Sequence, residues 1–297
     1  MSDDLFLGID GGATQSRARI RDAAGRLLGE GQSGPANSRL GIAETIGAVL
    51  AAAGAAARAA GLADLGRLHA GLGLAGVTGE RERALILAEP LPFASTAVDS
   101  DAYAAWLGAC GGKDGAILIV GTGSCGLAVV GGRRINVGGW GDIISDEGSG
   151  NAIGREALRR AVWALEGLIP PSALAETILA RFGRDPEKVI AWAASARKGD
   201  FARFAPLVFE RAAARDSLGM ALAADAARDI ARMAERLLEV GAPSVCLIGG
   251  LAASIAPWLP PPLRDRLAPP LADAVDGAIL MARQGLAQAL ASGTTRA

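Results

Sequence analysis

Three glycine-rich turns, each after a short apolar run, are the features of this sequence that suit phosphate chemistry. They are Gly11 and Gly12 after LFLGID, Gly121 to Ser124 after AILIV, and Gly249 and Gly250 in SVCLIGG. Glycine lets backbone amides approach a phosphate, and open α/β sheets bind ligands where their strands end. One such turn is more often a simple tight turn, but three in a repeated context predict a phosphate-binding site.

The second turn also matches GxGxxG, a dinucleotide-binding pattern, through Gly121, Gly123 and Gly126. In a dinucleotide-binding fold the third glycine opens a helix, whereas LAVVGGRRINV here predicts a β-hairpin. A nicotinamide cofactor is therefore disfavoured. A Walker loop is also missing, because Lys113 is followed by Asp114 in place of serine or threonine.

The segments around the first two turns predict the same three-stranded arrangement twice. In the first copy, residues 5–10, 13–22 and 27–33 are apolar or alternating and are separated by turn residues. In the second copy, AILIV, LAVV and RINVGGW repeat this plan. Such repetition predicts two similar domains. We place them at residues 1–112 and 113–297, with the last helix free to pack back on the first domain.

Helices and strands alternate between the two copies, and helices prevail after them, so the expected fold class is α/β. Between the copies we expect helices at 42–65 and 102–108 and strands at 68–74 and 95–98. After them we expect helices at 151–165, 172–182, 186–196, 219–240 and 272–291, a strand at 244–249 and a proline-rich loop at 257–270.

The composition disfavours several classes of partner. Thirty basic and 31 acidic residues leave a formal net charge of −1 over 297 residues, so no global field favours nucleic acid or an anionic membrane. The weakly polar stretch 42–65 carries charged side chains and is a poor membrane span. Three separated cysteines and an acidic start without an apolar signal core favour a cytoplasmic protein with a small-molecule ligand.

Four segments, in this order and spacing, resemble a known family. IDGGATQS, GTGS, GGWGDIISDEGSG and LIGGLAAS look like the BadF/BadG/BcrA/BcrD ATPase family, in particular its N-acetylglucosamine and glucosamine kinases. The resemblance covers about the whole chain, and GGWGDIISDEGSG is its most specific piece. It implies the fold shared by sugar kinases, Hsp70 chaperones and actin, in which two ribonuclease-H-like domains bind ATP and Mg²⁺ in an interdomain cleft.

The resemblance assigns ATP to residues of all three turns. Asp10 would hold Mg²⁺ as a hard oxygen ligand beside the phosphates. The residues expected to contact ATP are Gly11, Gly12, Ala13 and Thr14 in a first phosphate loop, Gly121, Thr122, Gly123 and Ser124 in a second, and Gly249, Gly250 and Leu251 at adenosine. Family members often carry lysine where this chain has Gln15, so the first loop lacks one positive charge.

The general base implied by the resemblance is Asp101, which would take the proton of the sugar hydroxyl as the phosphoryl group arrives. From spacing alone, an aspartate before a run of helix formers is equally well a helix N-cap. Asp99 is a second candidate base, but it falls on the strand side of the boundary and fits the family pattern less well.

Asn37 and Asp146 match positions that hold sugar hydroxyls in the amino-sugar kinases, and Gly76 is a third candidate for the sugar pocket. Short polar side chains on loops suit this task. The alternatives from the residues themselves are a turn role for Asn37 and a helix-capping role for Asp146 or Ser149.

The implied reaction is transfer of the γ-phosphoryl group of ATP to the 6-hydroxyl of glucosamine or N-acetylglucosamine. Cys125 and Ser145 differ from the residues of the mammalian-like N-acetylglucosamine kinases, and this difference slightly favours glucosamine, the free amine, as the substrate. Two alternatives stay open. The first is an ATP-dependent activator of a CoA-ester reductase or dehydratase, which needs cysteine thiolates to hold an iron–sulfur cluster. The second is a non-catalytic sugar sensor. A homodimer also stays open.

Overall fold

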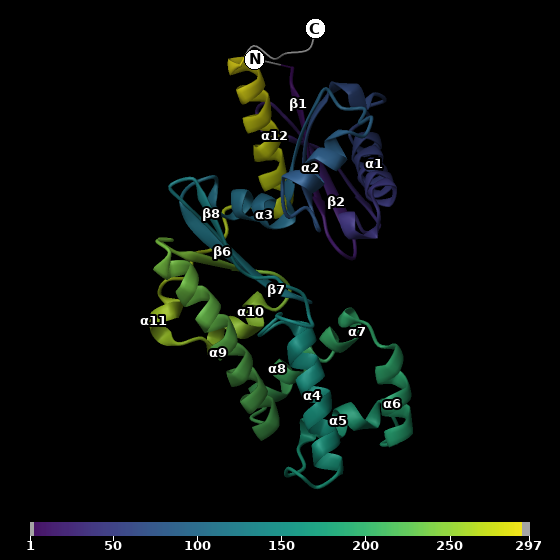
Figure 1. Cartoon of the computed structure of the whole chain (residues 1–297), viewed down its shortest axis with the longest axis vertical. Coiled ribbons are helices and arrows are strands. Elements are labelled where there is room, and N and C mark those ends of the chain that lie inside the picture. The colour runs from purple at the N-terminus through teal and green to yellow at the C-terminus, as the bar shows by residue number, and fades with distance from the viewer. Residues whose placement is uncertain (1–2, 293–297) are drawn as a thin grey trace. The chain divides into compact units, whose positions relative to one another are not determined.

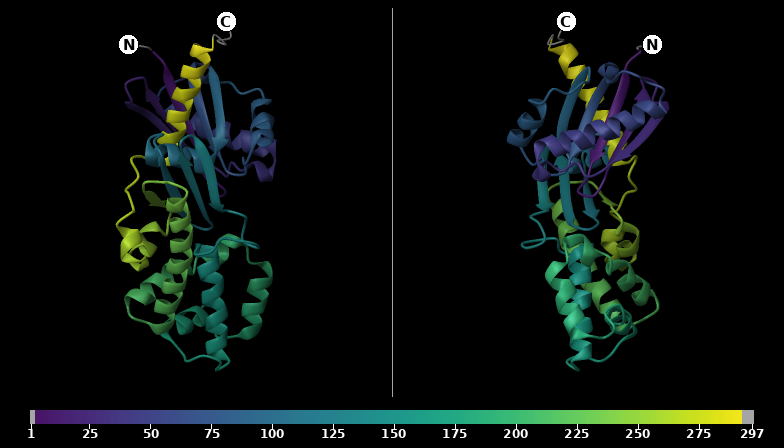
Figure 2. Two further views of the ribbon diagram at one scale, coloured as in Figure 1. Left: turned by 60° about the vertical axis from the view of Figure 1, so that its left-hand side comes forward. Right: turned by 90° about the vertical axis from the view of Figure 1, so that its right-hand side faces the viewer.

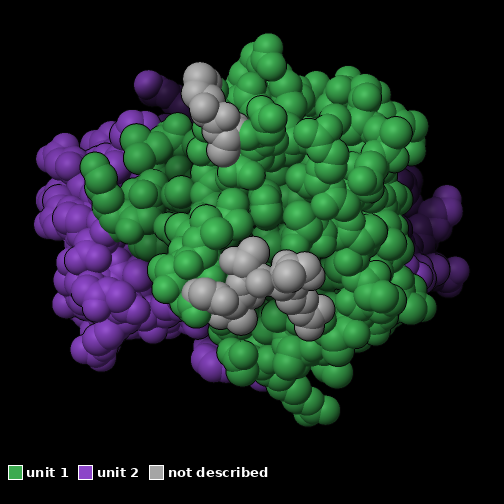
Figure 3. All heavy atoms as spheres, turned by 90° about the horizontal axis from the view of Figure 1, so that it is seen from above, with its two compact units in different colours: residues 1–113, 270–297 green, residues 114–269 purple. Residues whose placement is uncertain are grey.

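The computed structural model describes residues 3–292 and divides the chain into two compact units. Unit 1 comprises residues 1–113 and 270–297, and unit 2 comprises residues 114–269 (Figure 3). The carboxyl-terminal segment therefore belongs with the amino-terminal third of the chain.

Unit 1 is built on a mixed five-stranded sheet with the order β3-β2-β1-β4-β5. The first three strands form an antiparallel meander, and β4 and β5 run parallel to β1. The strands are β1 (Leu5–Gly11), β2 (Ser16–Asp22), β3 (Leu27–Ser33), β4 (Leu68–Leu74) and β5 (Ser95–Ser100). The meander and both parallel strands were predicted, and the structure confirms them.

Helices cover both faces of this sheet, and the alternation of side chains along β1 shows why (Figures 1 and 2). Leu7 and Ile9 point into the core formed with α1, whereas Phe6 packs against Ile279 of α12 on the other face. The helices are η1 (Ser38–Leu40), α1 (Ile42–Ala59), η2 (Leu65–Arg67), α2 (Glu80–Leu87), α3 (Asp101–Cys110) and α12 (Ala274–Ala291). The short helix α2 was not predicted.

Glycines let α12 lie directly against the strands and against α3. A Cβ atom at Gly71 of β4 would lie 1.9 Å from the carbonyl oxygen of Ala278, and one at Gly277 would lie 1.9 Å from that of Ala104. Side chains at these positions would push α12 away from the sheet.

The helix α1 is long and apolar enough to span a membrane by length and composition alone. Its buried side chains, which include Ile46, Val49 and Ala53, belong to the core of unit 1. This packing accounts for the apolar composition, so the length is weak evidence for a membrane segment.

Unit 2 repeats the sheet order of unit 1 with one strand fewer among the described residues. Its order is β8-β7-β6-β9, with an antiparallel meander and β9 parallel to β6. The strands are β6 (Gly115–Val120), β7 (Ser124–Val130), β8 (Arg133–Gly138) and β9 (Val245–Ile248). The predicted internal repetition is confirmed at the level of strand order.

Helices make up most of the rest of unit 2 and enclose one continuous core with its sheet. They are α4 (Gly150–Leu165), α5 (Ala173–Ala180), α6 (Pro186–Ser195), α7 (Lys198–Ala202), α8 (Ala205–Ala213), α9 (Ser217–Glu239), α10 (Ala252–Ile255), η3 (Ala256–Trp258) and α11 (Pro261–Arg264). The helices α7 and α8 were not predicted. The segment expected as a proline-rich loop contains α11, because proline is well tolerated in a first helical turn.

Candidate functional site

The first glycine turn closes the hairpin between β1 and β2. The backbone N–H of Gly12 donates to the carbonyl of Gln15 at 3.0 Å, and Ala13, Thr14 and Gln15 are exposed. The predicted first phosphate loop is therefore an open hairpin tip, whose hydroxyl and backbone groups face solvent.

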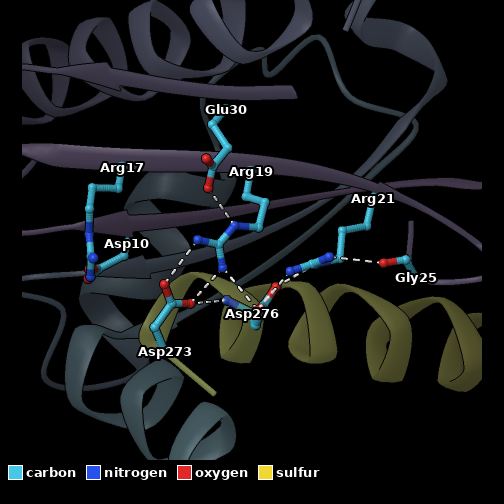
Figure 4. A network of polar contacts seen from close by, with 8 residues as sticks. All are labelled: Asp10, Arg17, Arg19, Arg21, Gly25, Glu30, Asp273 and Asp276. Carbon is cyan, nitrogen blue, oxygen red and sulfur yellow. Dashed lines mark hydrogen bonds and ion pairs between the residues drawn. The ribbon is translucent and has the colours of Figure 1, made fainter. Parts of the chain in front are cut away.

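Asp10 ends β1 beside this loop and carries an arginine partner that we did not predict. It lies opposite Arg17 in the strand register, and the Nη2 atom of Arg17 is 2.7 Å from its Oδ2 atom (Figure 4). The side chain of Asp10 is 19% exposed and that of Arg17 is 42% exposed. The carboxylate thus stays accessible to an incoming ligand.

Asp101 is the first residue of α3, and Ser100 caps that helix. The Ser100 hydroxyl accepts from the N–H of Tyr103 at 3.1 Å, so the interpretation of Asp101 as the N-cap is wrong. The Oδ1 atom of Asp101 accepts from the N–H of Ala102. Burial raises the pKa of Asp101, and the negative charge of Asp10 raises it further. The carboxylate is therefore a stronger base than an exposed aspartate.

Asp99 lies two residues before Asp101 but has different surroundings. It is 7% exposed, its Oδ1 atom accepts from the N–H of Ser100 at 2.8 Å, and its Oδ2 atom lies 3.5 Å from the Nη1 atom of Arg83 on α2. Because its carboxylate has these structural partners, Asp99 is the weaker candidate for a general base.

The two predicted sugar-binding positions of unit 1 lie side by side. A Cβ atom at Gly76 would lie 2.6 Å from the Oδ1 atom of Asn37, and the backbone N–H of Ser38 donates to the carbonyl of Ala75. The Oδ1 atom of Asn37 accepts from the N–H of Arg39, so Asn37 also has the turn-stabilising role considered from the sequence.

Backbone hydrogen bonds tie these segments to the first phosphate loop. Ala75 donates to Gly11 at 2.7 Å, and Ala36 donates to Gly12 at 3.2 Å. Since Asp101 follows β5 of the same sheet, the structure gathers all the predicted site residues of unit 1 at the carboxyl ends of β1, β4 and β5.

In unit 2, the second predicted phosphate loop is held against the N-terminus of α4. Gly121 donates to Gly123 across the turn, while Gly150 donates to Gly121 at 2.8 Å and the N–H of Asn151 donates to Thr122 at 3.1 Å. The first two N–H groups of α4 are thereby bonded to loop carbonyls, which fixes the loop against the helix.

Asp146 supports this loop from the side. It is 2% exposed, adopts a left-handed φ of 72°, and accepts from the N–H of Ser124 at 3.2 Å through Oδ1. The Ser124 hydroxyl donates to the carbonyl of Glu147 at 2.7 Å. Ser149 caps α4 by accepting from Ala152, so the capping role belongs to Ser149 and not to Asp146.

The third glycine turn packs on the end of β6. Gly249 has a φ of 102°, and a Cβ atom there would lie 2.5 Å from the carbonyl oxygen of Val120. That same carbonyl accepts from the N–H of Leu251 at 3.0 Å. Both glycine turns of unit 2 therefore meet at the carboxyl ends of neighbouring parallel strands.

A cavity of about 580 Å³ in unit 2 lies beside this arrangement without including the second phosphate loop. Residues of the 142–148 segment, α4 and α9 line it, among them Glu147, Arg155 and Asp229. Its volume alone does not mark the nucleotide site, because none of residues 121–124 lines it.

The sequence interpretation missed two residues that contact predicted site residues. Arg17 pairs with Asp10, and Asn151, 2% exposed, has a side-chain Nδ2 group without a hydrogen-bond partner among the described residues. The alternation of arginines with Ala18 and Ile20 already put Arg17 on the face of β2 opposite the α1 core, but its partner depends on strand register.

The carboxylate of Asp10 fits one Mg²⁺ ion that takes most of its oxygen ligands from the substrate. Within residues 3–292 no three histidine, cysteine, aspartate or glutamate side chains gather as a metal cluster. Mg²⁺ usually takes one or two carboxylates plus phosphate and water oxygens, so the exposed edge of Asp10 is sufficient.

The repeated sheet order, with glycine turns at the strand ends of each unit, is that of the actin-like ATPase fold. A ROK family glucokinase from Streptomyces griseus shares this fold with a TM-score of 0.53 and 18% identity, over 94% of this chain and 99% of that chain.

The chain belongs to the BadF/BadG/BcrA/BcrD ATPase family, whose sequence pattern matches residues 7–263. It is 38% identical to the glucosamine kinase GspK of Vibrio cholerae over 281 residues, 94% of this chain and 96% of that protein. A structure from Chromobacterium violaceum, described as a candidate N-acetylglucosamine kinase, has a TM-score of 0.87 and 35% identity over 94% of this chain and 99% of that chain. The predicted family is confirmed.

Proposed function

We propose that this protein is an ATP-dependent amino-sugar kinase that phosphorylates the 6-hydroxyl of glucosamine or N-acetylglucosamine. Near full-length similarity to a glucosamine kinase supports the reaction type and favours the free amine. We expect the protein to act in the cytoplasm on a small molecule, with ATP and Mg²⁺ and without a nucleic-acid or membrane partner.

The predicted site residues have distinct roles in this reaction. The loops at Gly11–Thr14 and Gly121–Ser124 bind the phosphates, and Gly249–Leu251 face adenosine. Asp10 would hold Mg²⁺, which would supply charge neutralisation at the phosphates. Asn37, Gly76 and Asp146 orient the sugar.

Asp101 takes the proton from the 6-hydroxyl as its oxygen attacks the γ-phosphorus. The O–P bond to the sugar forms, the bond from the γ-phosphorus to the bridging oxygen breaks, and ADP leaves. The observation that carries this proposal is the partly buried Asp101 carboxylate, with its raised pKa, at the same sheet edge as Asp10.

A coupled assay of ADP release tests the proposal. Purified protein with MgATP is compared with and without glucosamine, N-acetylglucosamine, N-acetylmannosamine and glucose. We expect release to depend on one of the two glucosamine sugars, with glucosamine giving the higher kcat/KM. ATP turnover that no sugar stimulates would contradict the kinase and favour the activator or sensor alternatives.

A further inference from the structure

A row of three arginines lines one face of β2, and two of them hold α12. Arg19 forms paired hydrogen bonds with Asp273 at 2.9 and 3.1 Å, and Arg21 pairs with Asp276 at 2.7 Å (Figure 4). These two arginines therefore have a structural role, because they fasten the C-terminal helix to the sheet.

Arg17 continues this row but has a different partner. It forms an ion pair with Asp10, at the carboxyl end of β1, and Figure 4 shows this pair set apart from the α12 carboxylates. One Nη atom makes this contact, whereas a guanidinium carries five N–H donors. With 42% of the side chain exposed, the other donors of Arg17 remain available to a ligand.

The first loop has no basic residue of its own. Gly11 to Ser16 contain neither lysine nor arginine, and Gln15 is exposed at the tip of the hairpin. A polyphosphate approaching this loop meets the carboxylates of Asp10 and Asp101 on the same sheet edge. Unless a cation offsets their charge, these carboxylates would repel it.

We propose that Arg17 is the phosphate-binding cation of the first loop. Its guanidinium pairs with Asp10 through one Nη atom and offers its remaining N–H groups to the terminal phosphates of ATP. Arg17 thus supplies, from the facing strand, the charge that Gln15 lacks. This inference rests on the proposed function, because it takes ATP as the ligand of this loop.

Metal-free nucleotide affinity tests the role of Arg17 apart from turnover. Binding of the non-hydrolysable analogue AMPPNP and of adenosine is measured by titration calorimetry in EDTA. We expect Arg17→Gln to weaken AMPPNP binding by about 10- to 100-fold, the usual effect of losing a charge-assisted hydrogen bond to an anion, and to leave adenosine binding unchanged. Arg17→Lys should restore part of the affinity, because it keeps the charge without the guanidinium fork.

Arg26→Gln is the matched control. Arg26 lies in the turn between β2 and β3, at the opposite end of β2 from the first loop, and pairs with Asp22, so its substitution should leave both affinities unchanged. AMPPNP affinity of Arg17→Gln within twofold of wild type would overturn the inference, as would an equal loss for adenosine. A wild-type protein that binds no AMPPNP in EDTA would overturn the inference, and one that binds none with Mg²⁺ either would overturn the proposed function as well.

Discussion

At the residue scale, two aspartates two positions apart differ through their surroundings. Asp99 accepts a backbone hydrogen bond and faces Arg83, whereas Asp101 lies at the start of α3 near Asp10. An arginine stabilises a carboxylate, while burial and a second carboxylate make it more basic. The environment therefore favours Asp101 for proton transfer and Asp99 for structure.

Replacing Asp101 by asparagine should lower turnover while raising the thermal stability of the protein. We expect sugar-dependent turnover to fall by about 10²- to 10⁴-fold, the usual contribution of a general base. The thermal midpoint should rise, because the change removes a partly buried charge that the fold disfavours. Ser100→Ala is the control: it removes the helix cap at a cost of about 1 kcal/mol and keeps the base. Normal turnover of a folded Asp101→Asn variant would contradict the assignment.

The stability gain of Asp101→Asn should depend on pH. Since the pKa of Asp101 is raised on folding, the folded state binds this proton more tightly than the unfolded state. Ionised Asp101 therefore destabilises the folded state, and this free-energy penalty grows as pH rises from the usual aspartate pKa through the raised pKa of the folded protein. Thermal unfolding of both proteins should show a difference at pH 7.5 that disappears near pH 3.5. An unchanged difference would mean that the gain has another origin.

At the element scale, two adjacent glycines of the third turn give a matched pair of tests. Gly249→Ala places a Cβ at a left-handed φ and 2.5 Å from the carbonyl oxygen of Val120, whereas Gly250→Ala meets no atom within 4 Å. We expect Gly249→Ala to lose at least about 1–2 kcal/mol of stability and Gly250→Ala to lose much less. Thermal unfolding of the two variants measures this difference. Equal midpoints would contradict the close approach of Gly249 to the carbonyl oxygen of Val120.

The attachment of α12 is a second test at this scale. Burial alone would raise the pKa of Asp276, but the guanidinium groups of Arg21 and Arg19 hold it below its usual value. Asp276→Asn should therefore cost about 1–3 kcal/mol at neutral pH. The cost should shrink as pH falls below the usual aspartate range, because the wild-type carboxylate is then protonated as well.

Hydrogen exchange measured on peptides of β2 and α12 reports this loss locally. Faster exchange in both elements at neutral pH, with little change in the helices of unit 2, is the expected pattern. Protection equal to wild type in β2 and α12 would show that the ion pairs add no stability.

At the scale of the whole molecule, unit 1 depends on both ends of the chain. Residues 270–297 supply α12, whose Ile279 and Ala282 cover Phe6 on the sheet. A chain that ends at Pro269 would expose this apolar face. We expect unit 1 to lose its protease resistance while unit 2 keeps it. A truncated chain with a protease-resistant unit 1 would contradict this dependence.

The sequence alone was sufficient for the local features of the fold. Apolar runs ending in glycines located the strands and turns, and the repeated meander predicted two similar sheets. The family resemblance then located Asp10, Asp101 and the loop residues. The sequence did not predict α2, which has little amphipathic pattern, or the short helix α7. It also did not predict α8, although the buried Leu207, Val208 and Phe209 of that helix do form an apolar face.

Only the tertiary structure decided which side chains became partners. Ser100, not Asp101, caps α3; Asp99 meets Arg83 of α2; and Arg17 meets Asp10, whereas Arg19 and Arg21 hold a helix from the far end of the chain. Glycine turns and apolar alternation act within a few residues and are therefore written in the local sequence. Burial, charge pairing and pKa arise between elements distant in the chain, so they are set when the sheet and its covering helices pack together.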